Sequence, residues 1–281
     1  MKENMKERMR PGVFIRRYGR IIFGGTVLVI LIIAAIAAPL LTPYDPIQVS
    51  YYETKIEPCP THIMGTDAYG RDIYAWVLYG ARISLIVGFG VAVVSSVFGI
   101  VLGLLMGYYK RFDMIMMRVL EGISAFPSML LAMTFAAVFG SGVDKVILAI
   151  ALVSTPSVAK IVRSQVLSIR ESEHVESAKA MGASDARIIF KYILPLCTSP
   201  LIIRFTASMA SAILTEASLS YLGVGISPTI PTWGNSLSTS RLHVISHPYM
   251  TVFPGLAIII TVLSISIMGD GLRDVLDPKL K

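Results

Sequence analysis

Two histidines near the C-terminal end of the chain have the spacing of a pair of metal ligands. His243 and His247 are four residues apart, so on a helix both imidazoles would lie on one face and could bind one metal ion. The surrounding segment, RLHVISHPY, is short and contains no carboxylate or thiol that would complete the coordination of a metal. We therefore predict ordinary loop histidines and no metal site.

Glu216 is a sharper candidate because it is the only acidic residue of the apolar stretch Pro200–Leu222. An ionisable side chain in a membrane helix usually faces the interior of the protein and often marks a transport pathway. Alternatively, Glu216 lies near the outer boundary of the membrane and forms hydrogen bonds with a loop. Both interpretations remain open: a residue of the gate or path, or a structural hydrogen-bonding group.

The sequence contains none of the motifs that would bind a nucleotide or form a common catalytic centre. It has no GxxxxGK[ST] loop, which cradles the phosphates of ATP, and no HExxH or CxxC motif. No arrangement of serine, histidine and acid typical of a hydrolase is recognisable. We therefore expect that the chain is not an enzyme and binds no cofactor of its own.

Composition places the chain among membrane proteins, with 54% hydrophobic residues, 15% charged residues and a mean hydropathy of +0.68. A helix of about 20 apolar residues crosses the hydrocarbon core of a bilayer. The first apolar stretch is longer than the roughly 7–15 residues of a cleaved signal peptide, which predicts a membrane anchor. Six stretches predict an all-α polytopic protein: Ile21–Leu41, Ile83–Gly107, Gly122–Val143, Val146–Val162, Pro200–Leu222 and Tyr249–Gly269.

The distribution of Lys and Arg predicts the orientation in the membrane, since short cytoplasmic loops are enriched in these residues. With both termini in the cytoplasm, twenty of the 25 Lys and Arg residues lie on the cytoplasmic side or at its boundary. Five remain outside: Lys55, Arg71, Arg82, Lys145 and Arg241. This topology accounts for the net charge of +7 without nucleic acid as a partner.

A charged, helix-forming stretch, ESAKAMGASDARIIFKYILP at residues 176–195, interrupts the apolar sequence. Helical spacing would place Val175, Ala178 and Met181 on one side of a first short helix. Gly182 can end this helix in the left-handed conformation without a steric penalty. The stretch therefore predicts a helical hairpin on the cytoplasmic side.

The second half of the hairpin would begin at Ser184 as the N-cap, with Asp185 favourably placed in the first turn. Apolar pairs four residues apart follow, and Pro195 marks the passage into the next membrane span. Such a hairpin could dock a soluble partner. It could instead lie on lipid headgroups as a surface helix.

The stretch resembles the EAA loop of ATP-binding cassette (ABC) importer permeases, whose pattern is EAA, three residues, G, nine residues and I-x-L-P. Ser177 stands in place of an alanine and Tyr192 in place of an isoleucine. By this resemblance, the residues that couple the chain to an ATPase are Glu176, Ser177, Ala178, Gly182, Ala183, Leu194 and Pro195.

Further stretches are similar to the dipeptide, oligopeptide and nickel branch of these permeases. They are GTDAYGRD (Gly65–Asp72), GARISL (Gly80–Leu85), AFPSMLLA (Ala125–Ala132), EASLSYLGVG (Glu216–Gly225) and GDGLRDVLDP (Gly269–Pro278). The resemblance implies the type I ABC importer permease fold, with six transmembrane helices and cytoplasmic coupling helices. It divides the chain into a cytoplasmic tail (1–20) and a transmembrane permease domain (21–281) with an outer loop (42–82) and a cytoplasmic coupling loop (164–195).

The resemblance also implies the partners and the location of the chain. In this family two permeases pair around a central path in the cell inner membrane, two ATPase subunits that bind ATP and Mg²⁺ dock from the cytoplasm, and an external solute-binding protein delivers the solute. ATP-driven closure of the ATPases moves the docked helices, and the path opens alternately outward and inward. The outer loop has more acidic than basic residues, which suggests that it contacts these outer partners; a structural role is the alternative. The candidate contact residues are Asp67, Arg71 and Asp72 in this loop and Trp233 in the last outer loop.

The resemblance to this branch offers two candidate classes of solute. A dipeptide or oligopeptide is the first choice, and nickel or a metal chelate is the second. A proton-coupled secondary transporter would also be polytopic, but it would normally need ionisable groups at the midplane, and Glu216 is the only clear one. A membrane enzyme would need a cluster of catalytic side chains near one face, which the sequence does not show.

Overall fold

The computed structural model describes residues 11–276, with side chains from residue 18 onward, and this part of the chain is helical. Its one extended pairing is the antiparallel bridge between Thr66 and Asp72. The helices are α2 (Pro11–Ile36), α3 (Ala38–Leu41), α4 (Ile73–Tyr108), α5 (Lys110–Ser124), α6 (Ser128–Phe139), α7 (Val143–Arg170), α8 (Glu173–Ala180), α9 (Asp185–Arg187), the π-helical turn η1 (Ile188–Ile193), α10 (Leu194–Tyr221), α11 (Trp233–Ser240) and α12 (Tyr249–Leu276).

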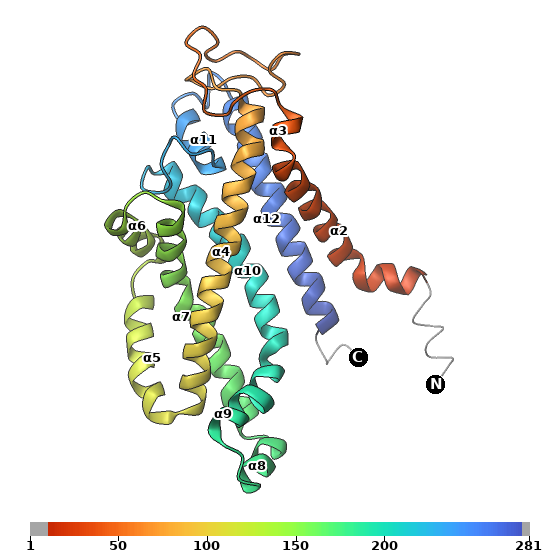
Figure 1. The fold of residues 1–281 in the computed structure, drawn as a ribbon, viewed down its shortest axis with the longest axis vertical. Helices are drawn as coiled ribbons and strands as arrows, with labels where there is room; N and C mark the ends of the chain where they lie inside the picture. Colours follow the sequence, from red (N-terminus) through yellow and green to blue (C-terminus); the bar gives the residue numbers. More distant parts are fainter. Residues whose placement is uncertain (1–10, 277–281) are drawn as a thin grey trace.

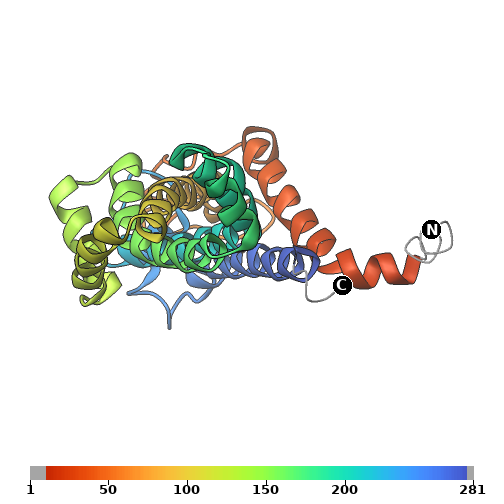
Figure 2. The same cartoon turned by 90° about the horizontal axis from the view of Figure 1, so that it is seen from below.

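The long helices α4, α7, α10 and α12 run along the long axis of the molecule (Figure 1). The segment between α3 and α4 (residues 42–72, the α3–α4 segment) covers one end. The hairpin (residues 172–193), made of α8, α9 and η1, lies at the other. Seen from the hairpin end, α5 and α6 lie on one side of the bundle and α2 on the opposite side (Figure 2). The sites predicted from sequence are therefore divided between two distant ends.

Five helices are long and apolar enough to cross a membrane, and a sixth span results if α5 and α6 are counted together. The predicted continuous span Gly122–Val143 is wrong, because the chain bends by 91° between α5 and α6. Pro127 lies at the bend, where it lacks a backbone N–H and restricts Phe126 to non-helical conformations. The stretch is apolar, as predicted, but the helix breaks at the proline.

Two helices begin before the predicted membrane spans. α2 begins at Pro11, within the predicted tail 1–20, whose first ten residues lie outside the described part of the chain. α4 begins at Ile73, within the predicted loop 42–82 and ten residues before the predicted span. The start of α4 is set by Asp72, whose carboxylate accepts a hydrogen bond from the backbone N–H of Ala75 at 2.7 Å.

Small residues on α4 form a groove where this helix packs against α7. Glycines spaced four apart face valines spaced four apart: Gly99 faces Val158, Gly103 faces Val162 and Gly107 faces Val166. A Cβ atom at Gly99 or Gly103 would lie 2.5 Å from the Cβ atom of the facing valine. The absence of side chains on one helix therefore allows the two backbones to approach closely.

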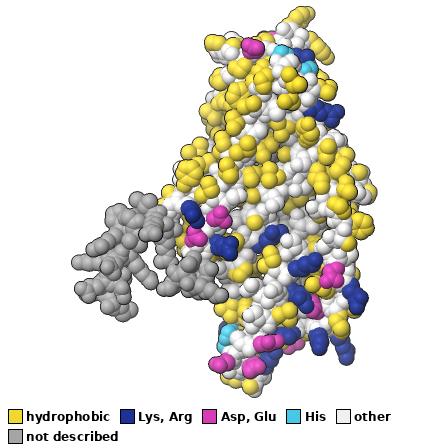
Figure 3. All heavy atoms as spheres, turned by 180° about the vertical axis from the view of Figure 1, so that it is seen from behind, with side chains coloured by type: hydrophobic (Ala, Val, Ile, Leu, Met, Phe, Trp, Pro, Cys, Tyr) yellow, Lys and Arg dark blue, Asp and Glu magenta, His cyan; other side chains and the backbone are white. Residues whose placement is uncertain are grey.

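On the face shown in Figure 3, many hydrophobic side chains lie between the two ends of the molecule, and charged side chains gather toward the hairpin end. Large apolar residues are exposed along several spans, for example Ile33, Phe89 and Leu263 at 58%, 55% and 54%. In water such a surface would be unfavourable, whereas lipid tails or a partner membrane subunit would cover it. This surface agrees with a membrane-embedded bundle.

Candidate functional site

The first half of the hairpin has the predicted conformation. α8 buries Val175 and Ala178, and Gly182 follows with a φ of +77°. The backbone N–H of Ala183 donates to the Ala178 carbonyl at 3.1 Å and that of Gly182 to the Lys179 carbonyl at 2.9 Å, which closes the helix end. The predicted left-handed end at Gly182 is therefore confirmed.

Met181 differs from the prediction. It is 78% exposed and does not share the buried side of Val175 and Ala178. Met181 is the C-cap of α8, so the helix ends before another full turn could bring this side chain onto the buried face. The exposed surface of the hairpin thus carries an apolar side chain beside Glu176 and Ser177, which are also exposed.

The second half of the hairpin continues directly into α10. Ser184 occupies the predicted N-cap position, but its side chain makes no capping hydrogen bond. After the single turn of α9, η1 leads into α10, whose second residue is Pro195. A proline clashes with the carbonyl four residues before it in a regular α-helix, and the π turn provides wider spacing there. Pro195 is exposed and Leu194 is half-buried.

The hairpin is anchored on the ends of α4 and α7. Ile188, Ile189 and Ile193 of η1 are buried in a cluster with Leu104 of α4 and Val162 of α7. Burial of each of these isoleucines contributes roughly 1.5–3 kcal/mol. The exposed part of the hairpin is therefore attached to a packed base rather than to a mobile loop.

Asp185, the first residue of α9, connects the hairpin to the end of α4. Its carboxylate accepts hydrogen bonds from the hydroxyl of Tyr108 at 2.7 Å and from that of Tyr109 at 3.2 Å. Arg170, at the end of α7, donates to the Gly107 carbonyl at 3.2 Å. Sequence reasoning missed both tyrosines, because residues 77 positions apart give no local signal of their contact.

Glu216 lies near the other end of the bundle and is completely buried. Ser220 donates to its carboxylate at 2.9 Å and Ser84 at 3.5 Å. The backbone N–H of Trp233, the first residue of α11, lies 3.5 Å from the same Ser84 hydroxyl. These contacts join α4, α10 and α11 through a single carboxylate, so Glu216 has the hydrogen-bonding environment of the structural interpretation.

The acidic and basic residues predicted in the outer loop are buried within the chain. Asp67 and Arg71 form an ion pair of 2.6 Å, and each has 7% of its surface exposed. The Arg71 guanidinium also lies 3.9 Å from the centre of the Trp76 ring. Asp72 caps α4 with one oxygen and binds Nδ1 of His62 with the other at 2.9 Å. These side chains hold the α3–α4 segment together.

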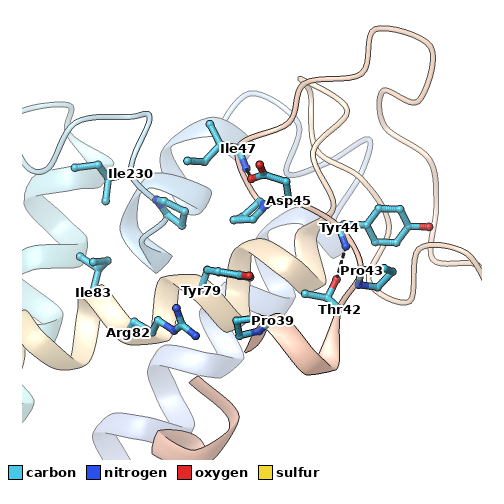
Figure 4. Close-up of a pocket in the computed structure, with 12 residues that line it drawn as sticks. Pro39, Thr42, Pro43, Tyr44, Asp45, Ile47, Tyr79, Arg82, Ile83 and Ile230 are labelled. Atoms are coloured by element: carbon cyan, nitrogen blue, oxygen red, sulfur yellow. Dashed lines mark hydrogen bonds between the residues drawn. The ribbon is translucent and has the colours of Figure 1, made fainter. Parts of the chain in front are cut away.

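Trp233 is also buried, and its indole N–H donates to the Val77 carbonyl of α4 at 3.0 Å. A cavity of about 610 Å³ lies beside this region, between α4 and the start of the α3–α4 segment (Figure 4). Arg82 lines the cavity and donates to the carbonyls of Ala35 and Ile36 at the end of α2. The guanidinium that faces this cavity is therefore already hydrogen-bonded to backbone carbonyls of the same chain.

The two histidines of the spaced pair lie in the connection between α11 and α12. The ring centres of His243 and His247 are 6.2 Å apart. Within residues 18–276, no group of three or more His, Cys, Asp or Glu side chains has the arrangement of a metal site.

Family comparisons account for most of the chain. Residues 95–281 match the model of the binding-protein-dependent transport system inner membrane component, and residues 20–58 match the N-terminal transmembrane domain of oligopeptide transport permease C. The first match includes the hairpin, α10 with Glu216, and α12.

Similar chains occur in several bacteria. A putative peptide transport system permease protein of Brucella suis is 42% identical over 92% of this chain and 87% of its own length. The dipeptide transport system permease protein DppC of Alkalihalophilus pseudofirmus is 43% identical over 92% and 86%. The glutathione transport system permease protein GsiD of Pectobacterium atrosepticum is 42% identical over 95% and 89%.

A solved structure shares the fold. The inward-facing MetNI methionine ABC transporter contains a chain that matches 72% of this chain and 97% of its own length, with a TM-score of 0.61 and 18% identity. The extent of the family match and the identities above 40% confirm the predicted family. The chain therefore belongs to the family of binding-protein-dependent transport system inner membrane components, the membrane-spanning permease subunits of ABC importers.

Proposed function

We propose that this chain forms one half of the translocation path of an ATP-driven peptide importer. The observation that carries the proposal is the hairpin: an exposed, partly apolar tip closed by Gly182 on a base packed against α4 and α7. The peptide and dipeptide permeases among its relatives support a dipeptide or oligopeptide as the solute. The glutathione permease supports the same chemical class, since glutathione is a small peptide.

In this proposal one ATPase subunit docks on this hairpin from the cytoplasm and a second docks on the corresponding hairpin of the other permease. Both bind ATP and Mg²⁺ and supply the energy of ATP hydrolysis. The exposed side chains at the tip, Glu176, Ser177 and Met181, provide the mixed polar and apolar surface that such docking needs. The packed base transmits the movement of the ATPases to α10, α4 and α7, and the path then opens toward the opposite side. A second permease completes the path.

The α3–α4 segment faces the outside in the same proposal, with both termini in the cytoplasm, and it meets the solute-binding protein or the second permease. Because Asp67, Arg71 and Asp72 are buried, other side chains must form this contact. Exposed aromatic and aliphatic residues at this end have the character of an interface centre, in particular Tyr51, Tyr52, Ile63, Leu242 and Ile245.

The test is uptake of a labelled dipeptide into proteoliposomes that contain the chain, its sister permease and both ATPases, with ATP inside and binding protein outside. We expect uptake that requires ATP, the ATPases and the binding protein together. Uptake driven by a proton gradient without the ATPases would instead identify a secondary transporter. Uptake of a nickel chelate but of no peptide would contradict the proposed solute.

A further inference from the structure

Two neighbouring cavities, together called the groove here, lie at α6, α7 and α10 and at the bend between α5 and α6. Their volumes are about 250 and 520 Å³, and both are lined by Ser128, Val153 and Ser157. The first extends to Ser211 and Thr215 of α10, and the second extends to Ser124 and Lys160. The groove therefore runs lengthwise between membrane helices and is rich in hydroxyl groups.

The groove contains positive charge and no negative charge. Arg204 of α10 lines the first cavity and Lys160 of α7 lines the second, while neither lining includes an Asp or Glu. An intramembrane cation is costly and normally faces a partner or a water-filled path. No carboxylate of the described chain serves Arg204 as a partner.

Arg204 has more N–H donors than the surrounding side chains and backbone supply acceptors. A guanidinium carries five N–H groups, and here Nη2 donates to the hydroxyl of Ser157 at 2.8 Å. Nε is buried and has no hydrogen-bond partner within the described part of the chain. Lys160 is bound at 3.0 Å to the hydroxyl of Ser124, which can accept but carries no charge to compensate the ammonium.

The backbone next to the groove is irregular as well. The bend between α5 and α6 at Ala125–Pro127 places Phe126 and Ser128 in the lining, and Pro156 interrupts the hydrogen bonding of α7 opposite. Non-helical backbone at membrane depth is tolerated where it lines a cavity or is covered by protein. The helix bend and a guanidinium without a carboxylate partner therefore lie at the same groove.

We propose that Arg204 binds the C-terminal carboxylate of the transported peptide while the peptide passes along this groove, with Lys160 as the next cation on the way. The inference rests on peptide import as the function of the chain. A carboxylate matches the flat fork of a guanidinium and can accept two N–H bonds from it. The serine and threonine hydroxyls beside it can hydrogen-bond the peptide backbone without selecting its side chains.

The test compares one peptide with a free C-terminal carboxylate and the same peptide as its C-terminal amide. Both are supplied on saturated binding protein to proteoliposomes with the complete transporter, and each variant is normalised to wild type. We expect Arg204→Gln to lower uptake of the free acid by about tenfold or more and to leave uptake of the amide within about twofold. Arg204→Lys, which keeps the charge, should retain part of the preference for the acid.

Arg241→Gln provides the matched control, because Arg241 is exposed in the connection after α11 and lies outside the groove. It should alter uptake of neither peptide. Equal loss of both peptides in Arg204→Gln would overturn the inference and assign Arg204 a structural role. A loss that disappears in vesicles of purely zwitterionic lipid would also overturn it, since Arg204 would then bind the headgroup of an anionic lipid.

The inference can fail separately from the proposed function. Normal uptake of both peptides by Arg204→Gln would reject the carboxylate site and leave peptide import intact. Absence of peptide uptake by the wild-type complex, with uptake of another solute, would reject both.

Discussion

Trp76 and Trp233 each donate their indole N–H to a backbone carbonyl beside the other. Trp76 of α4 binds the carbonyl of Thr232 at 2.9 Å, and Trp233 of α11 binds the carbonyl of Val77 at 3.0 Å. Both indole rings are buried, so losing either indole N–H would remove a buried hydrogen bond between α4 and the start of α11. This exchange fixes α11 against the start of α4, beside Glu216.

We expect Trp76→Phe and Trp233→Phe each to destabilise the permease by about 1–3 kcal/mol. The double variant should cost less than the sum, because both bonds join the same two segments. Thermal unfolding of the purified complex measures the loss, with Tyr52→Phe as the control at a fully exposed aromatic residue. Additive losses would mean that the two bonds act independently.

Replacing Gly182 should separate assembly of the membrane part from docking of the ATPases. A valine at a φ of +77° is strained by roughly 1–2 kcal/mol and adds bulk at the exposed tip of the hairpin. We expect Gly182→Val to pair with the sister permease but to lose the ATPases in a detergent pull-down, together with substrate-stimulated ATP hydrolysis.

Gly25→Val is the matched control for this experiment. Gly25 also has open space around the position of a Cβ atom, but it lies within α2 and lacks a positive φ. It should retain both ATPases. Retention of both ATPases by Gly182→Val as well would indicate that the hairpin lies on lipid headgroups and is not the docking element.

Glu216 should tolerate glutamine and reject leucine. Glutamine can keep hydrogen bonds with Ser84 and Ser220, whereas leucine leaves these buried hydroxyls unsatisfied at about 1–3 kcal/mol. We expect Glu216→Gln to assemble and transport, and Glu216→Leu to assemble poorly in membranes. A well-assembled Gln variant without transport would require a charge at this position and favour proton coupling.

The bonds between Asp185 and the two tyrosines at the end of α4 should affect coupling more than docking. The Tyr108→Phe/Tyr109→Phe variant removes both hydroxyls that bind Asp185 and leaves the exposed tip of the hairpin unchanged. We expect normal binding of the ATPases, with fewer peptides transported per ATP hydrolysed. Unchanged stoichiometry would limit these bonds to a role in stability.

Cysteine labelling tests the orientation of the two ends. Arg111, in the first turn of α5, and Ile245, which is 98% exposed after α11, are accessible positions at opposite ends of the bundle. In a background with Cys59 and Cys197 replaced, an impermeant reagent should label Ile245→Cys in intact cells and Arg111→Cys only in opened membranes. Labelling of both in intact cells would exclude the proposed topology.

Features with a local cause could be predicted from the sequence. The apolar spans follow from composition, the turn at Gly182 follows from glycine chemistry, and the groove on α4 follows from residue spacing. The size of the bend at Pro127 could not be predicted, because a proline can produce anything from a mild kink to a break and the neighbouring helices decide which.

Features that depend on contacts distant in sequence could not be predicted. Asp67 and Asp72 appear as surface acids in the sequence, and only the folded chain places Arg71 and His62 against them. The groove around Arg204 combines side chains of three separate helices, and its shape exists only after they pack. The sequence shows that a charged residue such as Arg204 lies in an apolar stretch, but it does not show which side chains the residue contacts.

The close packing of α2 against α12 also constrains the order in which the subunit folds. A Cβ atom at Gly24 would lie 2.9 Å from the backbone nitrogen of Met268, and one at Gly271 would lie 2.9 Å from that of Ile21. The ribosome makes α2 long before α12, at about 5–20 residues per second, so α2 enters the bilayer without its partner. During synthesis α2 is therefore in the bilayer before α12 exists, and the packing of α12 against α2 is one of the last steps in the folding of the subunit.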